Sequence, residues 1–189
     1  MEVKEAIEKR RAYRSLEKVL ITEDTIQDLA ESAQLAPSCF NNQPWRFVFV
    51  INEEILHSVF DTLSQSNTWA HSASMVIAVF TKKELDCLNK QREYSFFDTG
   101  MAAAFIILRA TELQLVAHPI AGFDEQKVKS ILRIPEDMRV LTLMIVGKHS
   151  KEINPVLSET QVKSERKRPE RLPLSKFMYI NRYKEDYNG

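Results

Sequence analysis

Apolar and polar residues follow helical and strand-like periods in turn along the first third of the chain. Residues 2–11 place their apolar side chains on one helical face, which predicts a short amphipathic helix. A second helix is expected after Thr22, whose hydroxyl suits a helix N-cap, and it must end before Pro37. Aromatic and β-branched residues then predict a strand over 45–51, followed by a helix over 52–63.

Continuous apolar runs mark the strands expected at the centre of a sheet. Met75–Thr81 and Val140–Val146 are apolar almost throughout, as is typical of strands covered on both faces. Between these two strands we expect a short strand or loop near Val116 and a helix over 124–132.

Residues 96–113 form the most apolar helical segment. A surface helix normally has one apolar stripe, but this segment is apolar nearly all round. Two interpretations remain open: a central core helix, or a helix covered in part by a second subunit. One sheet layer in a chain this small cannot easily cover every face of such a helix, which favours the second interpretation.

The last part of the chain, residues 151–189, is interrupted by prolines and shows little periodicity. A tail of this length is either disordered or wrapped over a partner. Apolar residues between Phe177 and Tyr183 are anchors that a disordered tail normally lacks. We therefore expect an arm that wraps over another subunit.

Composition limits the classes of function. The 189 residues suit one domain, and 44% hydrophobic with 28% charged residues is typical of a soluble globular protein. Lys plus Arg and Asp plus Glu both number 26, and the resulting zero net charge argues against a nucleic-acid or membrane-surface binder. No apolar run has the length of a membrane span, and the N-terminus lacks a signal-peptide core, so a cytoplasmic location is expected.

Cysteine and glycine are both scarce. Cys39 and Cys87 form no CxxC or Cys/His cluster, so neither a disulfide framework nor a metal site is expected. The 4 glycines cannot form a GxGxxG or P-loop motif, and a nucleotide-like cofactor would need side chains to hold its phosphate. No Ser/His/Asp or paired-carboxylate arrangement for catalysis can be assembled.

Four segments, taken together and in this order, resemble the FMN-dependent nitroreductase family. They are Arg10-Arg11-Ala12-Tyr13-Arg14, the Ala-Pro-Ser to Gln-Pro-Trp-Arg-Phe run over 36–47, Pro119–Asp124, and Arg171–Leu174 with Asn181-Arg182-Tyr183. The second segment is the most specific. The resemblance implies an α+β fold with a mixed, mainly antiparallel sheet flanked by helices. It also implies one FMN-binding domain over 1–189 and a homodimer joined through the 96–113 helix and an exchanged C-terminal arm from about residue 151.

Arginines are the expected phosphate ligands. Arg10 and Arg14 are four residues apart, so on one helix face they could grip a phosphate together, although basic residues at a helix end are commonly just solvated. The resemblance implies that Arg10, Arg11, Arg14 and Arg171 bind the FMN phosphate, with Arg168 as a fallback in the tail. Two departures are Ala12 and Leu172, where the family has a serine and often a lysine.

Other residues are expected to surround the flavin ring. The resemblance implies that Pro37, Ser38, Asn41 and Gln43 come from the partner subunit and cover the ring, although a turn that merely joins a helix to a strand would look similar. It also implies that the backbone N–H of Ala121, beside Gly122, lies near the flavin nitrogen that accepts hydride. Further candidates are a ring contact from Asn67 or Trp69 and a structural or proton-donating role for His118.

The resemblance implies a flavin-centred reaction without a catalytic side chain. Hydride would pass from NADH or NADPH through FMN to a nitroaromatic, quinone or similar acceptor, in ping-pong order. The stretch over 82–95 is too short for the large lid insertions of some relatives. Two alternatives remain open: an FMN-binding carrier or sensor without NAD(P)H turnover, and a cofactor-free structural dimer.

Overall fold

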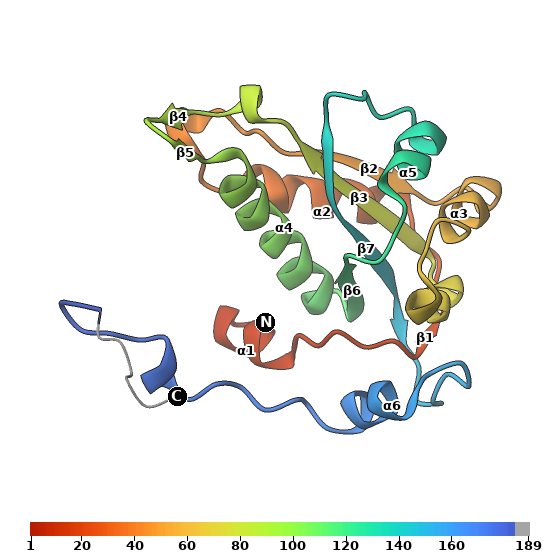
Figure 1. Cartoon of the computed structure of the whole chain (residues 1–189). Coiled ribbons are helices and arrows are strands. Elements are labelled where there is room, and N and C mark those ends of the chain that lie inside the picture. The colour runs from red at the N-terminus through yellow and green to blue at the C-terminus, as the bar shows by residue number, and fades with distance from the viewer. Residues whose placement is uncertain (184–189) are drawn as a thin grey trace.

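The computed structural model describes residues 1–183, and residues 184–189 of the expected arm lie outside the described part. Its centre is a five-stranded sheet (Figure 1). Four strands lie in the order β1, β7, β3 and β2, and the fifth, β6, also pairs with β7. Every pair of strands in this sheet is antiparallel. The strands are β1 (Leu16–Glu17), β2 (Arg46–Val50), β3 (Met75–Thr81), β6 (Leu115–Ile120) and β7 (Arg139–His149).

Strand β3 contributes side chains to the hydrophobic cores on both faces of the sheet. All of its residues are buried, as its continuous apolar run predicts. Met75, Ile77 and Val79 belong to the core formed with α2 (Glu23–Gln34) and α4 (Ser95–Glu112). The alternate residues Val76, Ala78 and Phe80 pack in the other core with α3 (Glu53–Phe60) and α5 (Glu125–Leu132). Figure 1 shows these helix pairs on opposite sides of the strands.

Polar N-caps set the starts of several helices. The Thr22 hydroxyl accepts a hydrogen bond from the backbone N–H of Thr25, which confirms the expected start of α2. Asp124 caps α5 in the same way by accepting from the backbone N–H of Lys127. The predicted helices therefore form at the expected places, and their ends differ by a few residues.

Helix α4 confirms the apolar segment that the sequence predicts. One line of its residues, from Ser95 through Ala102 to Ala110, is buried against β3, β6 and α2. Phe96, Phe97 and Phe105 lie outside this line and are exposed in the single chain. The sheet thus covers only one face of α4, and a second apolar face remains uncovered.

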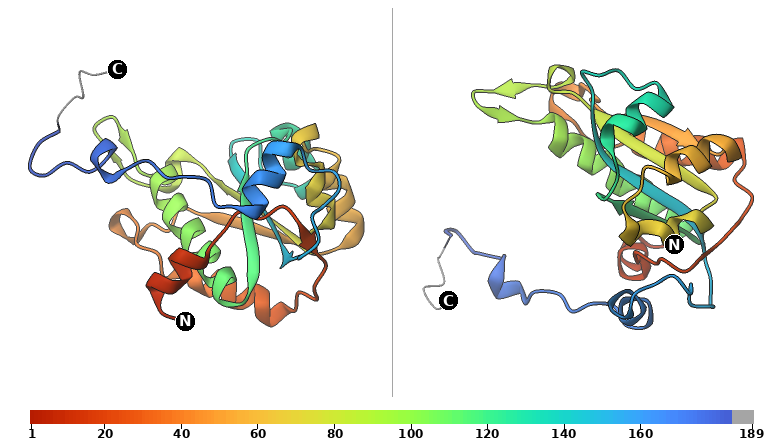
Figure 2. Two further views of the ribbon diagram at one scale, coloured as in Figure 1. Left: turned by 90° about the horizontal axis from the view of Figure 1, so that it is seen from below. Right: turned by 45° about the vertical axis from the view of Figure 1, so that its right-hand side comes forward.

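The structure departs from the sequence patterns at both ends of the chain. Helix α1 (Val3–Lys9) ends before Arg10, whose backbone is extended, so Arg10 and Arg14 do not lie on one helix face. The tail also contains a helix, α6 (Glu159–Arg166), which a capping box of Ser158 and Gln161 initiates. Beyond α6 the arm leaves the body of the chain (Figure 2), and its apolar side chains from Leu172 to Ile180 are exposed.

The expectation that the cysteines stay unpaired is also wrong. Cys39 and Cys87 form a disulfide across a sequence separation of 48 residues. Cys39 begins a short 3-10 turn (Cys39–Asn41), and Cys87 precedes the small hairpin of β4 (Leu88–Asn89) and β5 (Arg92–Glu93). The pairing depends on tertiary structure, because α2, β2 and β3 bring these two loops to the same edge of the molecule (Figure 1).

Candidate functional site

Arginines from both ends of the chain meet beside α1. Arg168 donates a hydrogen bond to the carbonyl oxygen of Arg10 at 2.8 Å, which ties the arm to the stretch that follows α1. Burial lowers the pKa of Arg10, and the nearby positive charges of Arg168, Arg171 and Arg11 lower it further. Within residues 1–183, no carboxylate forms an ion pair with any of these four arginines. Such a cluster of like charges attracts an anion.

Arg11 and Arg14 differ in what their guanidinium groups contact. Arg11 donates to the carbonyl oxygen of Glu165 at 3.2 Å and lies over the Tyr13 ring, so part of its donor capacity is used within the chain. The guanidinium of Arg14 lies 5.9 Å from the centre of the Trp69 ring. It makes no hydrogen bond within the described residues and is the freer of the two to bind a ligand.

Glu165 of α6 fixes the backbone at this place. Its carboxylate is buried and accepts from the backbone N–H of Arg14 at 2.6 Å and of Ser15 at 3.2 Å. Charge-assisted hydrogen bonds of this kind are among the stronger ones in proteins. The sequence gives a local signal for α6, in the Ser158 to Gln161 capping box, but none for this pairing with a residue 151 positions away.

His118 and Trp69 form a buried aromatic pair beneath the arginines. Their ring centres are 4.8 Å apart, and Nδ1 of His118 lies 3.0 Å from the carbonyl oxygen of Tyr13. His118 lies on β6 rather than in a loop, and burial lowers its pKa to about 4. The imidazole is therefore uncharged at neutral pH, and it does not supply a proton as an imidazolium.

Ala121 and Gly122 follow β6 and approach another loop closely. The side-chain amide of Asn67 donates to the carbonyl oxygen of Gly122 at 3.1 Å, and the backbone N–H of Ser64 donates to the same oxygen at 2.9 Å. A Cβ atom on residue 122 would lie 2.3 Å from Oγ of Ser64, so any larger residue here would require the neighbouring side chains or the backbone to move. Of the two candidates before β3, Asn67 thus lies at this segment, whereas Trp69 is a core residue.

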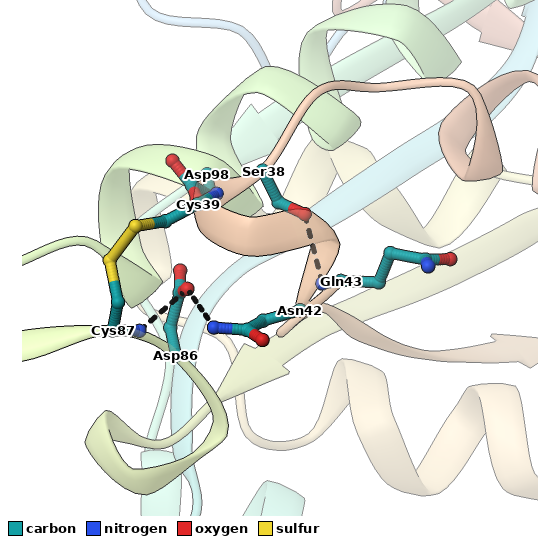
Figure 3. Close-up of a disulfide and its surroundings, with 7 residues drawn as sticks. All are labelled: Ser38, Cys39, Asn42, Gln43, Asp86, Cys87 and Asp98. Carbon is teal, nitrogen blue, oxygen red and sulfur yellow. Dashed lines mark hydrogen bonds between the residues drawn. A yellow bond between two sulfur atoms is a disulfide. The ribbon is translucent and has the colours of Figure 1, made fainter.

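The loop over 37–43 forms a separate group of candidate residues (Figure 3). Oγ of Ser38 accepts a hydrogen bond from the backbone N–H of Gln43 at 3.0 Å. The backbone N–H of Cys39 donates to Asp98 of α4 at 2.7 Å, which anchors the loop to the start of that helix. Asn41 and Gln43 have φ angles of 58° and 50°, in the left-handed region that non-glycine residues seldom occupy.

The structure does not bring all the predicted site residues together in one chain. The loop over 37–43 lies at the N-terminal end of α4, whereas α1 and the arginines that follow it lie at its C-terminal end, where Met1 pairs with Glu112 (Figure 1). The 18 residues of α4 span roughly 25 Å at the usual helical rise. One group contains Arg10, Arg11, Arg14, Ala121, Gly122 and Arg171, and the other contains Pro37, Ser38, Asn41 and Gln43.

Comparisons with known proteins identify the family. The nitroreductase family profile matches residues 7–83 and 64–148, so the chain belongs to the nitroreductase family. The oxygen-insensitive NADPH nitroreductase of Helicobacter acinonychis is 25% identical over 165 residues, which cover 68% of this chain and 78% of that protein.

Solved structures agree with this assignment. A nitroreductase family protein from Clostridium novyi NT has a TM-score of 0.74 and 27% identity, covering 80% of this chain and 87% of that one. An oxidoreductase containing FMN has a TM-score of 0.81 at 23% identity, covering 95% of this chain and 91% of that one, and it shows the shared fold. No helix within residues 1–183 is long and apolar enough to cross a membrane.

Proposed function

We propose that this protein is an FMN-dependent oxidoreductase that takes hydride from NADH or NADPH and passes it to a nitroaromatic, quinone or similar acceptor. The observation that carries the proposal is the arginine cluster. Arg10 and Arg171 come from opposite ends of the sequence, and Arg14 and Arg10 both lie close enough to His118 to affect its charge. None of these three arginines forms an ion pair with a carboxylate within residues 1–183. The family membership and the NADPH nitroreductase relative support an oxidoreductase.

The chemistry of the cluster suits the phosphate of FMN. A dianionic phosphate offers several acceptor oxygens, and arginine presents its N–H donors in a fixed fork that matches them. The burial and like charges that disfavour a charged Arg10 would be offset by such an anion. The family resemblance of the four segments and the FMN-containing oxidoreductase that shares the fold support FMN as the cofactor.

The separation of the two groups along α4 supports a homodimer with shared sites. In this proposal Arg10, Arg14 and Arg171 hold the phosphate, and the Ala121 backbone lies near the ring in the same subunit. Ser38, Asn41 and Gln43 would come from the second subunit and cover the ring. The uncovered face of α4 and the exposed apolar residues of the arm are surfaces that a second copy would bury. The whole chain then acts as one FMN-binding domain, with the arm from about residue 151 wrapping over the partner.

Within this site the protein binds and orients, and the cofactor carries the electrons. FMN, when bound, would supply the two-electron chemistry that links NAD(P)H to the acceptor. His118 does not act as a charged proton donor in this proposal, because it is buried and uncharged at neutral pH. Both substrates would use the same exposed face of the site, which predicts ping-pong kinetics.

An anaerobic experiment tests this proposal. The protein is reconstituted with FMN and its absorption near 450 nm, about the usual flavin maximum, is followed after NADH or NADPH is added. We expect the band to bleach with at least one nucleotide and to return when a quinone is added. A band that persists with both nucleotides would favour an FMN carrier or sensor. A chain that binds no FMN would leave a cofactor-free dimer.

A further inference from the structure

The Cys39–Cys87 disulfide joins two surface segments that the hydrophobic cores do not hold. Cys39 lies in the loop over 37–43, and Cys87 lies just before the hairpin of β4 and β5, whose strand residues are all exposed. Neither cysteine belongs to either core cluster. Their Cα atoms are 6.1 Å apart, within the usual range for a disulfide. The disulfide therefore links these two surface segments to each other and does not cross-link the hydrophobic core.

The loop that the disulfide holds has an unfavourable backbone. Phe40, Asn41 and Gln43 all have positive φ angles, and Phe40 is 90% exposed, so burial of its ring does not stabilise this conformation. Within residues 1–183, three hydrogen bonds tie this loop to other segments besides the disulfide. They run from the backbone N–H of Cys39 to Asp98, from the Asn42 side chain to Asp86 at 3.2 Å, and from the Arg46 side chain to the carbonyl oxygen of Gln43 at 3.0 Å. Other hydrogen bonds, such as the one that Ser38 accepts from Gln43, lie within the loop itself (Figure 3).

The two cysteines line a cavity that is open in the single chain. Both cysteines are partly exposed, and the cavity has a volume of about 500 Å³. Phe40, Leu88 and Phe97 on its walls are exposed in the single chain. The cavity is large enough for a low-molecular-weight thiol.

A carboxyl group lies directly beside the disulfide. An oxygen of Asp86 and the sulfur atoms of Cys39 and Cys87 all lie within 4.8 Å of one another. Asp98 is buried, and its pKa is raised by this burial and by the neighbouring carboxyl group of Asp86. Oδ2 of Asp86 is buried without a hydrogen-bond partner within residues 1–183. The Asp86 carboxyl group next to the sulfurs thus has one oxygen to which a proton can bind.

We propose that the Cys39–Cys87 disulfide is a thiol-exchange site, and that its reduction by a low-molecular-weight thiol releases the loop over 37–43. In the first step a thiolate attacks one sulfur, forms a mixed disulfide with it and expels the other cysteine as a thiolate. That cysteine takes a proton from the Asp86–Asp98 pair or from water. A second small thiol then resolves the mixed disulfide, so that two small thiols become one disulfide and the protein gains two cysteine thiols. Because the loop carries Ser38, Asn41 and Gln43, this exchange controls FMN affinity, a consequence that rests on the proposed function.

Thiol titration combined with hydrogen exchange tests the exchange itself. The native full-length protein is equilibrated with glutathione buffers of increasing reducing strength, and free thiols are counted without denaturant. We expect both thiols to appear reversibly. Amide exchange in peptides covering 37–43 and 84–94 should then become about tenfold faster or more, while β3 stays protected. Thiols that appear only after the protein is unfolded, or loop peptides that exchange at one rate in both states, would overturn the proposal.

A titration with FMN distinguishes a failure of this redox proposal from a failure of the proposed FMN-dependent function. Reduced wild type should bind FMN about five- to tenfold more weakly than the oxidised protein, as expected for the loss of one or two hydrogen bonds. The Cys39→Ser/Cys87→Ser double variant should match the reduced protein and show no response to glutathione. Equal FMN affinity in both redox states would refute the claim that the disulfide controls FMN binding. If no FMN binds in either state, the proposed function fails, whereas the thiol and exchange results still decide whether the loop is released.

Discussion

The side-chain amide of Asn67 donates a hydrogen bond to the carbonyl oxygen of Gly122, with 3.1 Å between the two atoms. This contact joins the loop before β3 to the segment after β6, although 55 positions separate the two residues. It places a polar side chain and a tightly packed backbone at the position where the account puts the flavin ring. The effect of a substitution at Gly122 depends on the geometry around this contact.

Gly122→Ala should disturb the site through a steric clash. The added methyl group would lie 2.3 Å from Oγ of Ser64 and 2.8 Å from Nδ2 of Asn67, so these two side chains or the 121–122 segment must move. Overpacking of this kind typically costs about 1–3 kcal/mol, and FMN affinity should fall about tenfold or more because the Ala121 backbone shifts with it. Thermal unfolding and fluorescence titration measure the two effects.

Ser64→Ala in the Gly122→Ala background is the matched control. It removes the oxygen that makes the shortest contact, and it should restore part of both the stability and the FMN affinity. If the double variant is no better than the single one, the clash with Ser64 is not the cause.

Arg14→Ala should weaken FMN binding through the phosphate. A hydrogen bond to a charged group contributes about 1.5–3 kcal/mol, so the dissociation constant should rise roughly tenfold to a hundredfold. Riboflavin, which lacks the phosphate, should bind the variant and the wild type alike. Lys163→Ala, which removes an exposed charge on α6, should leave both affinities unchanged. An Arg14→Ala protein that loses riboflavin and FMN affinity equally would show that Arg14 supports the fold rather than the phosphate.

Glu165→Ala should destabilise the junction between the N-terminal stretch and the arm. The substitution leaves the backbone N–H groups of Arg14 and Ser15 without their acceptor, and burial of unpaired groups costs about 1–3 kcal/mol each. Urea unfolding should show this loss, and Glu165→Gln, which keeps one acceptor oxygen, should lose less. Glu159→Ala at the exposed start of α6 is the control, and an equal loss there would point to helix capping instead.

His118 should make the stability depend on pH. Burial lowers its pKa in the folded protein to about 4, from an ordinary value of 6.5. The unfolded chain then binds more protons between these two values, so stability falls as the pH is lowered from 6.5 to 4. The loss amounts to about 3 kcal/mol at most. Urea unfolding across this range should show a steeper pH dependence in wild type than in His118→Phe, which keeps a ring against Trp69. Identical slopes would show that His118 does not titrate as proposed.

Sequence patterns predict the elements well where burial repeats along one segment. Strand β3 begins and ends where its apolar run does, and α4 shows the all-round apolar pattern that was expected. Contacts between distant segments leave no such periodic signal. The extended backbone at Arg10 marks the end of α1, and Glu165 from the far end of the chain accepts hydrogen bonds from the backbone N–H groups of Arg14 and Ser15.

The same reason explains the errors in the candidate site. The sequence pattern predicts no disulfide between Cys39 and Cys87, because only the folded chain brings their loops together. The arginine motif and the loop over 37–43 were both recognised from local sequence. Their positions at opposite ends of α4 could not be, because this separation depends on how α4 and α1 pack. Residues of one local motif are therefore predictable from the sequence pattern, whereas the subunit that supplies each of them was predicted only through the family resemblance.

Native mass spectrometry of the FMN-titrated protein is the sharpest test of the shared FMN site, because it reports cofactor and subunit number in one species. We expect a dimer of 21.9 kDa chains that carries about one FMN per chain at saturation, with binding that needs both the arginines and the partner loop. A flavin-loaded single chain would contradict the shared site. A chain that takes up no FMN at all would contradict the proposed function.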